Sequence, residues 1–186
     1  TKSAAGNETL TLSNSGAVAG DQAAIQITTS STFTMTTTLT DIVFNTAEVL
    51  NNASVLNWTS GANITIGQTG PYLVYYSASN IGGGGSRSIN LRVRKNAATV
   101  LPGSTNTATN TNGNNPDIST SFVVILTSGD TIQLQVSDSR TGEVMPAGVT
   151  FGAVRLTAAT GQTGAAGTPG AAGPTGSGVN INVYDE

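Results

Sequence analysis

Glycine occupies every third position through residues 161–178 of this chain. It stands first in six consecutive triplets, at Gly161, Gly164, Gly167, Gly170, Gly173 and Gly176. In a collagen triple helix, three polyproline-like strands meet on an axis that admits only a hydrogen atom as side chain, so every third residue must be glycine. A flexible glycine-rich linker has no reason to keep this register. We therefore expect a short triple-helical stalk, and three chains joined through a trimeric head in front of it.

Most of the chain before the triplets alternates apolar and polar residues with a period of two. The segments Ile89–Arg94 and Ile132–Val136 show this alternation most clearly, and helical periodicity is hard to find. The continuous apolar run Phe122–Leu126 indicates a strand buried on both faces. Turn residues separate roughly eight to ten such segments, and the polar stretch Gly103–Asn115 is typical of a long tip loop. The pattern predicts an all-β fold, an antiparallel β-sandwich or jelly roll.

The composition excludes several classes of function. The chain has 186 residues, a net charge of −3 and only 9% charged residues, so we expect no nucleic-acid partner bound through a basic face. It contains no Cys and no His, which excludes ordinary zinc sites, thiol catalysis and imidazole acid–base chemistry. No apolar run is long enough to span a bilayer, and we expect no membrane insertion. We predict no cofactor and no enzymatic activity.

Four short motifs follow one another in the second half of the chain. They are Ile66–Tyr76 with its Gly-Pro-Tyr, Leu91–Asn96, Ser121–Leu134 with its Gly-Asp turn, and Thr150–Leu156. In this order they resemble the globular head of the tumour-necrosis-factor and complement-q superfamily, in its bacterial and phage form. The resemblance implies a jelly roll that forms a homotrimer through one face. It also implies a set of large side chains in the core of the head or on the trimer axis, namely Tyr72, Tyr75, Tyr76, Phe122 and Phe151.

The order of the segments predicts four parts. They are an N-terminal β segment or linker to a preceding module (1–30), a jelly-roll head (31–160), a collagen-like stalk (161–178) and the start of a following β segment (179–186). Complement-type proteins place the stalk before the head, whereas here it follows the head. The closing Ile-Asn-Val-Tyr-Asp-Glu resembles junctions in tailed-phage fibre and other virion proteins, particularly of cyanophage type.

Two functions of different class are consistent with this organisation. The first is a structural, non-catalytic virion protein of a tailed phage, a trimeric fibre or a capsid or tail decoration module, used for assembly, spacing or host-surface attachment. Its partners would be itself, other virion proteins and a host-surface glycan, and its location the surface of the virion. The alternative is a collagen-stalked bacterial surface or spore-coat adhesin, in which threonines of the triplets would carry glycans.

Single residues give weaker signals. The acidic side chains show no spacing that demands a catalytic pair, and only Asp117 and Asp138 are candidates for calcium, without a recognisable ligand loop. Trp58 is a candidate glycan contact if its indole face is exposed, and a packing residue if the sandwich covers it. The glycine-rich loop at 82–85 and the polar stretch Gly103–Asn115 are the other places where recognition could occur. We predict no catalytic, cofactor-binding or metal-binding residue.

Overall fold

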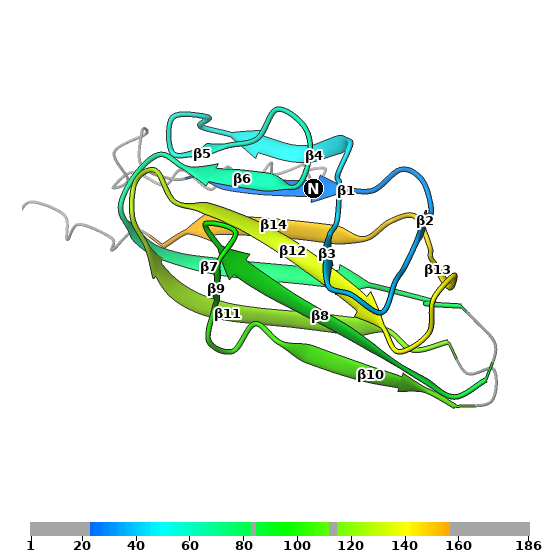
Figure 1. Cartoon of the computed structure of the whole chain (residues 1–186). Helices are drawn as coiled ribbons and strands as arrows, with labels where there is room; N and C mark the ends of the chain where they lie inside the picture. The colour runs from blue at the N-terminus through cyan, green and yellow to red at the C-terminus, as the bar shows by residue number, and fades with distance from the viewer. Residues whose placement is uncertain (1–22, 83–84, 112–114, 157–186) are drawn as a thin grey trace, which may run out of the picture.

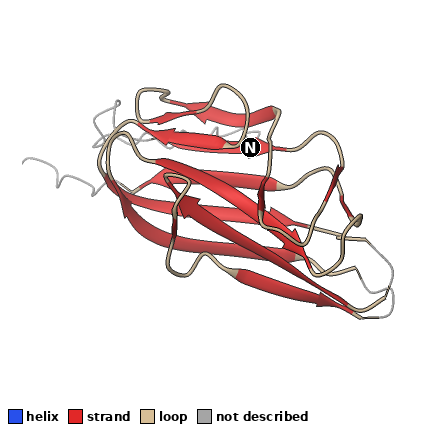
Figure 2. Ribbon diagram, viewed as in Figure 1, coloured by secondary structure: helices blue, strands red, loops and turns tan. Residues whose placement is uncertain are grey.

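Alternating side chains build two antiparallel sheets that face each other, as the computed structural model shows (Figures 1 and 2). The structure describes residues 23–82, 85–111 and 115–156. Within these residues the strands are β1 (Ala24–Thr28), β2 (Phe33–Thr34), β3 (Thr40–Asp41), β4 (Thr46–Asn51), β5 (Leu56–Asn57), β6 (Asn63–Ile66), β7 (Gly70–Ala78), β8 (Arg87–Lys95), β9 (Thr99–Val100), β10 (Asn106–Asn110), β11 (Ile118–Leu126), β12 (Thr131–Asp138), β13 (Val144–Met145) and β14 (Thr150–Arg155).

The strands pair across long distances in the sequence. One sheet has the order β11-β7-β14-β1-β4, and the other has the order β10-β8-β12-β6-β5, with β3 and β9 beside β12 and β8. A short pair, β13-β2, lies apart from both. The first described strand, β1, pairs with the last, β14, in antiparallel orientation. The two antiparallel sheets agree with the all-β jelly roll expected from the sequence. Across the described ranges there is no helix long and apolar enough to cross a membrane.

The core lies between the sheets and follows the period-two pattern. Inward positions of β7 (Tyr72, Val74, Tyr76) are at most 1% exposed, and those of β8 and β12 are apolar along most of their length. The rings of Phe44 and Phe151 stack with their centroids 5.8 Å apart. Burial of such side chains is the main stabilising contribution to a fold of this kind.

The first and last described residues lie at one end of the sandwich, and several strand connections lie at the other. Ala23 accepts a hydrogen bond from the Arg155 amide at 2.9 Å, so the described chain enters and leaves at one end. The opposite end carries the connections that follow β1, β7 and β12, because Thr28 pairs with Thr150 there and Ile118 with Ala78. Figure 1 shows these connections on the right.

Two sequence-based boundaries need correction. β1 lies inside a sheet of the sandwich, between β14 and β4, so the head begins before the boundary predicted at residue 30. The stretch Gly103–Asn115, interpreted as a tip loop, contains β10, which pairs with β8 from Asn106 to Asn110. The predicted stalk glycines and the segments 1–22 and 179–186 lie outside the described residues.

Candidate self-association surface

The outward side of the β11-β7-β14-β1-β4 sheet carries a row of apolar side chains. The register aligns Val123 with Leu73, Leu73 with Val154, and Val154 with Ala24, which makes one apolar row across four strands. We use the name apolar face for this row and the outward side chains beside it, which are Ala24, Gln26, Val49, Leu73, Tyr75, Val123, Ile125 and Val154.

Strand β11 leaves its outward apolar side chains in solvent. Val123 is 61% exposed and Ile125 is 75% exposed, whereas Leu126 at the end of the strand is fully buried. The run Phe122–Leu126 was interpreted as buried on both faces, and within one chain that interpretation is wrong. Phe122 and Val124 turn toward the core, and nothing in the described chain covers the other side. Adjacent exposed apolar residues on a strand mark a surface suited to contact with another chain.

The apolar face also lacks charge. Within the described ranges, the outward positions of β11, β7, β14 and β1 hold no Asp, Glu, Lys or Arg. Its polar contacts are internal, since the Tyr75 hydroxyl donates to Gln26 Oε1 at 3.1 Å. The Tyr75 ring lies directly over Gly152, where a Cβ would stand 2.4 Å from the ring carbon Cζ. On these four strands the outward positions are therefore uncharged, and the Glu48 carboxylate of β4 accepts a hydrogen bond from the outward Thr28 at 3.0 Å.

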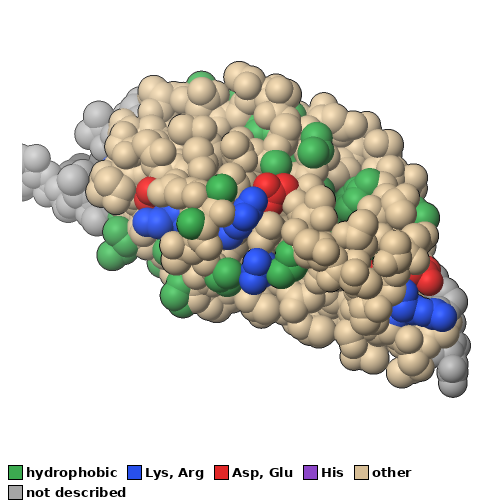
Figure 3. Space-filling view, in the orientation of Figure 1, with side chains coloured by type: hydrophobic (Ala, Val, Ile, Leu, Met, Phe, Trp, Pro, Cys, Tyr) green, Lys and Arg blue, Asp and Glu red, His purple; other side chains and the backbone are tan. Residues whose placement is uncertain are grey.

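The outward side of the other sheet has the opposite character. Its side chains on β8, β10 and β12 are polar or charged, namely Ser88, Asn90, Arg92, Arg94, Thr107, Thr109, Gln133, Gln135 and Ser137. We call this the polar face. Arg94 pairs with Asp41 at 2.8 Å, and Arg92 Nε donates to Gln135 Oε1 at 3.0 Å. Figure 3 shows basic side chains beside acidic ones on the visible side of the molecule.

The five aromatic residues predicted for the core or the trimer axis separate into two groups. Tyr72, Tyr76 and Phe151 are buried in the core, Phe122 packs against it, and Tyr75 alone lies on the apolar face. Burial raises the pKa of the Tyr72 and Tyr76 hydroxyls. These hydroxyls donate to the carbonyls of Gln68 and Ser104, at 2.6 and 2.8 Å.

Trp58 does not present an indole face to solvent. Its side chain belongs to the buried core cluster, with 7% of the residue exposed, and its Nε1 donates to the carbonyl of Gly61 at 3.1 Å. A sugar cannot stack on a ring that the protein already covers. The candidate glycan contact at Trp58 is therefore wrong, and the packing interpretation holds.

The two acidic residues considered for calcium are engaged elsewhere. Asp138 is buried and forms an ion pair with Arg87 at 2.7 Å, while its second oxygen accepts the Arg140 amide at 3.0 Å. Asp117 Oδ1 accepts the Asn80 amide at 2.7 Å. Among the residues that the structure describes, no group of three or more His, Cys, Asp or Glu is placed to hold a metal ion.

Solved structures share this fold at low sequence identity. Murine APRIL matches 73% of this chain and 99% of its own, with 14% identity and a TM-score of 0.51. The globular domain of zebrafish complement 1qA matches 73% of this chain and 98% of its own, with 16% identity and a TM-score of 0.51. No protein-family model and no curated protein sequence matches the chain. The jelly roll of the tumour-necrosis-factor and complement-q type is thus confirmed as a fold.

Proposed function

We propose that the chain is the trimer-forming, non-catalytic structural head of a tailed-phage virion, a fibre or a capsid or tail decoration module. The head assembles through its apolar face, and the glycine triplets form a collagen-like stalk behind it. The exposure of Val123 and Ile125 on the apolar face carries the assembly part of this proposal. Burying a side chain of this size against another copy contributes about 1.5–3 kcal/mol.

The glycine triplets favour three copies, and the position of β14 fits that number. This strand lies in the middle of the sheet that presents the apolar face, and it ends at Arg155, six residues before the first glycine triplet. Three copies joined around the apolar face would bring three such strands to a common axis. The triplets that follow need three chains, and eighteen residues at collagen rise make a rod of roughly 50 Å. Both features point to the same copy number.

The chemistry of the chain supports a structural rather than a catalytic role. With no Cys and no His in the sequence, its hydroxyl groups have no imidazole to activate them. The carboxylates of Asp41, Asp130 and Asp138 are bound in ion pairs. Residues 179–186 continue past the triplets in a strand-like pattern that resembles phage fibre junctions, which supports a place on the virion surface.

Light scattering of the full chain tests the assembly. We expect a mass three times the 18.6 kDa of one chain. A double substitution on the apolar face, Val123→Asp with Ile125→Asp, should reduce the mass to one chain, because paired carboxylates cannot be buried there. The matched control is Thr107→Asp with Thr109→Asp, also on exposed positions of an edge strand but on the polar face. It should remain trimeric.

Two further results separate the parts of the proposal. A version that ends at Thr160 should still be a trimer, because so short a triple helix does not assemble three chains alone. A monomeric full chain, or a trimer that tolerates the apolar-face substitutions, would contradict assembly through this face. Gold-labelled antibodies against the head should decorate phage particles, and labelling of bacterial envelopes instead would contradict the virion location.

A further inference from the structure

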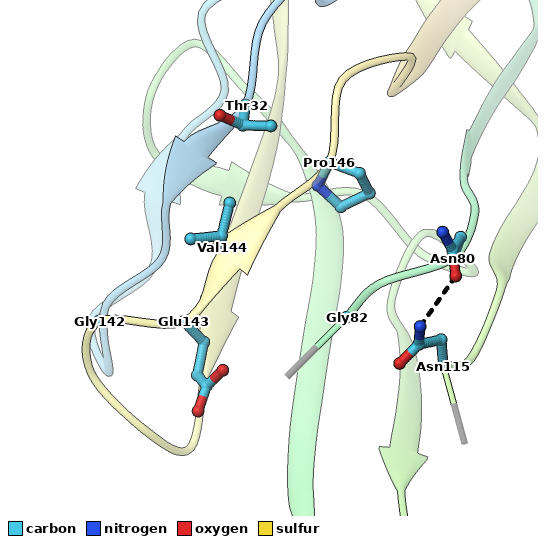
Figure 4. Close-up of a pocket in the computed structure, with 8 residues that line it drawn as sticks. All are labelled: Thr32, Asn80, Gly82, Asn115, Gly142, Glu143, Val144 and Pro146. Atoms are coloured by element: carbon cyan, nitrogen blue, oxygen red, sulfur yellow. Dashed lines mark hydrogen bonds between the residues drawn. The ribbon is translucent and has the colours of Figure 1, made fainter. Parts of the chain in front are cut away.

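A pocket opens at the end of the sandwich away from Ala23 and Leu156. Its volume is about 350 Å³, within the range of small-molecule sites. Four separate connections contribute to it, and we call it the tip pocket (Figure 4). The side chains used in the argument are Thr32, Asn80, Asn115, Glu143, Val144 and Pro146.

Two amides form one wall of the tip pocket. Asn115 Nδ2 donates to Asn80 Oδ1 at 2.9 Å, and this hydrogen bond holds the two side chains against each other (Figure 4). Within the described chain, this leaves Asn80 Nδ2 as a donor and Asn115 Oδ1 as an acceptor without a partner. A neighbouring donor and acceptor match the two hydroxyls of a vicinal diol, since each hydroxyl both donates and accepts.

The opposite wall combines a carboxylate with apolar carbon. Glu143 lies 3.2 Å from Arg87 and 3.8 Å from Arg140, and 21% of its side chain is exposed. Val144 and Pro146 follow it along the chain and offer C–H surface, such as the face of a pyranose ring presents. No Lys or Arg is among the described lining residues, so an anionic group would find no basic side chain in the wall of the pocket, and Arg87 and Arg140 are already paired with Glu143.

The walls are held before any ligand arrives. The Arg87 guanidinium is buried and binds Asp138, Glu143 and the carbonyls of Ile81 and Gly82, which ties the connection after β7 to that after β12. The Asn80 amide donates to Asp117 Oδ1 at 2.7 Å. A site fixed in this way loses little conformational entropy when it binds.

We propose that the tip pocket binds a neutral saccharide. The geometry supplies a donor, an acceptor, a carboxylate and a carbon surface around one hollow, which is the set a polyhydroxylated ring requires. Its position away from the stalk end directs it outward if the chain is a virion head, so the biological use as host-surface attachment rests on the proposed function. The pocket itself lies within one chain and needs no second copy.

Saturation-transfer difference NMR on the full chain tests the pocket. The probes are glucose, galactose and N-acetylglucosamine as neutral sugars, and glucuronic acid as an acidic one. We expect transfer to at least one neutral sugar and weaker transfer to glucuronic acid, because no basic side chain among the described lining residues can pair with its carboxylate. Asn80→Gly should weaken binding about tenfold. Glycine accepts the Asn80 backbone, whose φ is 53°, and keeps the amide bond to Asp117.

The matched control is Asn52→Gly, since Asn52 has a similar φ of 57° at the other end of the sandwich. It should bind as the unaltered chain does. No transfer to any neutral sugar, or equal transfer in Asn80→Gly and in the unaltered chain, overturns the proposal. Sugar binding by a chain that light scattering finds monomeric would leave this inference intact and remove only the trimer.

Discussion

The two outer faces of the sandwich handle charge in opposite ways. On the polar face, Arg94 has a carboxylate partner in Asp41, and Arg92 is held by Gln135. On the apolar face, the exposed carbons of Val123 and Ile125 have no partner in the described chain. One chain therefore pairs the charges of the polar face by itself, whereas it leaves apolar side chains of the other face uncovered within the described residues.

The residue patterns of the strands account for this difference between the two faces. β8 and β12 alternate apolar and polar residues, as a half-solvated strand does. β7 and β11 are apolar on both sides over Tyr72–Tyr76 and Phe122–Leu126. A strand with two apolar sides in a sheet with only one core has a second surface to bury. Four substitutions sharpen this contrast, and we take them from the largest expected effect to the smallest.

The largest effect should come from loss of the buried ion pair between Arg87 and Asp138, which lies on the inward side of the sheet that carries the polar face. Asp138→Ala removes the main partner of Arg87, whose side chain and that of Asp138 are both 0% exposed. Loss of the closest carboxylate from a buried guanidinium, which keeps only Glu143 at 3.2 Å, should lower the free energy of unfolding by about 3–5 kcal/mol. Urea denaturation at fixed protein concentration measures this loss. A change no larger than that of an exposed pair would mean that Glu143 and the carbonyls around Arg87 suffice.

The second effect concerns the centre of the apolar face. Gly152→Ala places a Cβ 2.4 Å from Tyr75 Cζ and 2.6 Å from the Ile25 carbonyl oxygen. The strands must move apart, and we expect a loss of about 2–3 kcal/mol in the free energy of unfolding. Gly148→Ala is the control, because no atom lies within 4 Å and only its φ of 87° opposes alanine. Equal losses in both variants would show that the face is not tightly packed.

A smaller effect depends on pH. Asp130 accepts the Thr127 amide at 2.8 Å and also binds Asn96 and Lys95, and these contacts, the Thr127 bond first, lower the pKa of its carboxyl. The stabilisation is complete above its ordinary value of 3.8 and is lost as the pH falls through the folded pKa. Asp130→Asn should cost about 1 kcal/mol at neutral pH.

The pH dependence provides the internal control for Asp130. Below the folded pKa both the unaltered chain and the variant carry a neutral side chain, so thermal unfolding midpoints should converge as acid is added. A difference that stays constant from neutral to acidic pH would show that the turn depends on the shape of Asp130 and not on its charge.

The smallest effect is expected on the polar face. Asp41→Asn breaks the pair with Arg94, whose two side chains are 23% and 29% exposed. Partly solvated pairs contribute little, and we expect at most about 1 kcal/mol, with a further decrease in high salt. Calorimetry at low and high salt checks this expectation. A loss as large as that of Asp138→Ala would remove the distinction between inward and outward charges.

Sequence reasoning identified the strands whose pattern is strong. The segments around β7, β8 and β12 were predicted from alternation, and their order also indicated the jelly roll. β10 was missed because Asn106–Asn110 consists of Asn, Thr and Ala, residues that are equally typical of a loop. β1 was recognised as a strand but placed outside the head, since its partners β14 and β4 cannot be read from local residues.

The candidate sites show the same limit. The run Phe122–Leu126 predicts a strand that is apolar on both sides, but the sequence does not indicate which side packs against the core of the same chain. The tip pocket joins Asn80, Asn115 and Glu143 from separate connections, and none of them has a motif around it. The sequence left open whether Trp58 is exposed or buried. Its Nε1 donates to the carbonyl of Gly61, three residues later, in a turn whose sequence has no distinctive pattern.

The first and last described strands, β1 and β14, are hydrogen-bonded neighbours, so Ala23 and Leu156 lie close together at one end of the head. The described chain begins and ends on neighbouring strands, about 5 Å apart, the spacing of paired strands. A module with this geometry can be inserted into a longer protein, or removed from it, without lengthening the path between the segments on either side. Such a head can then be gained, lost or exchanged while the flanking segments of the longer protein stay unchanged.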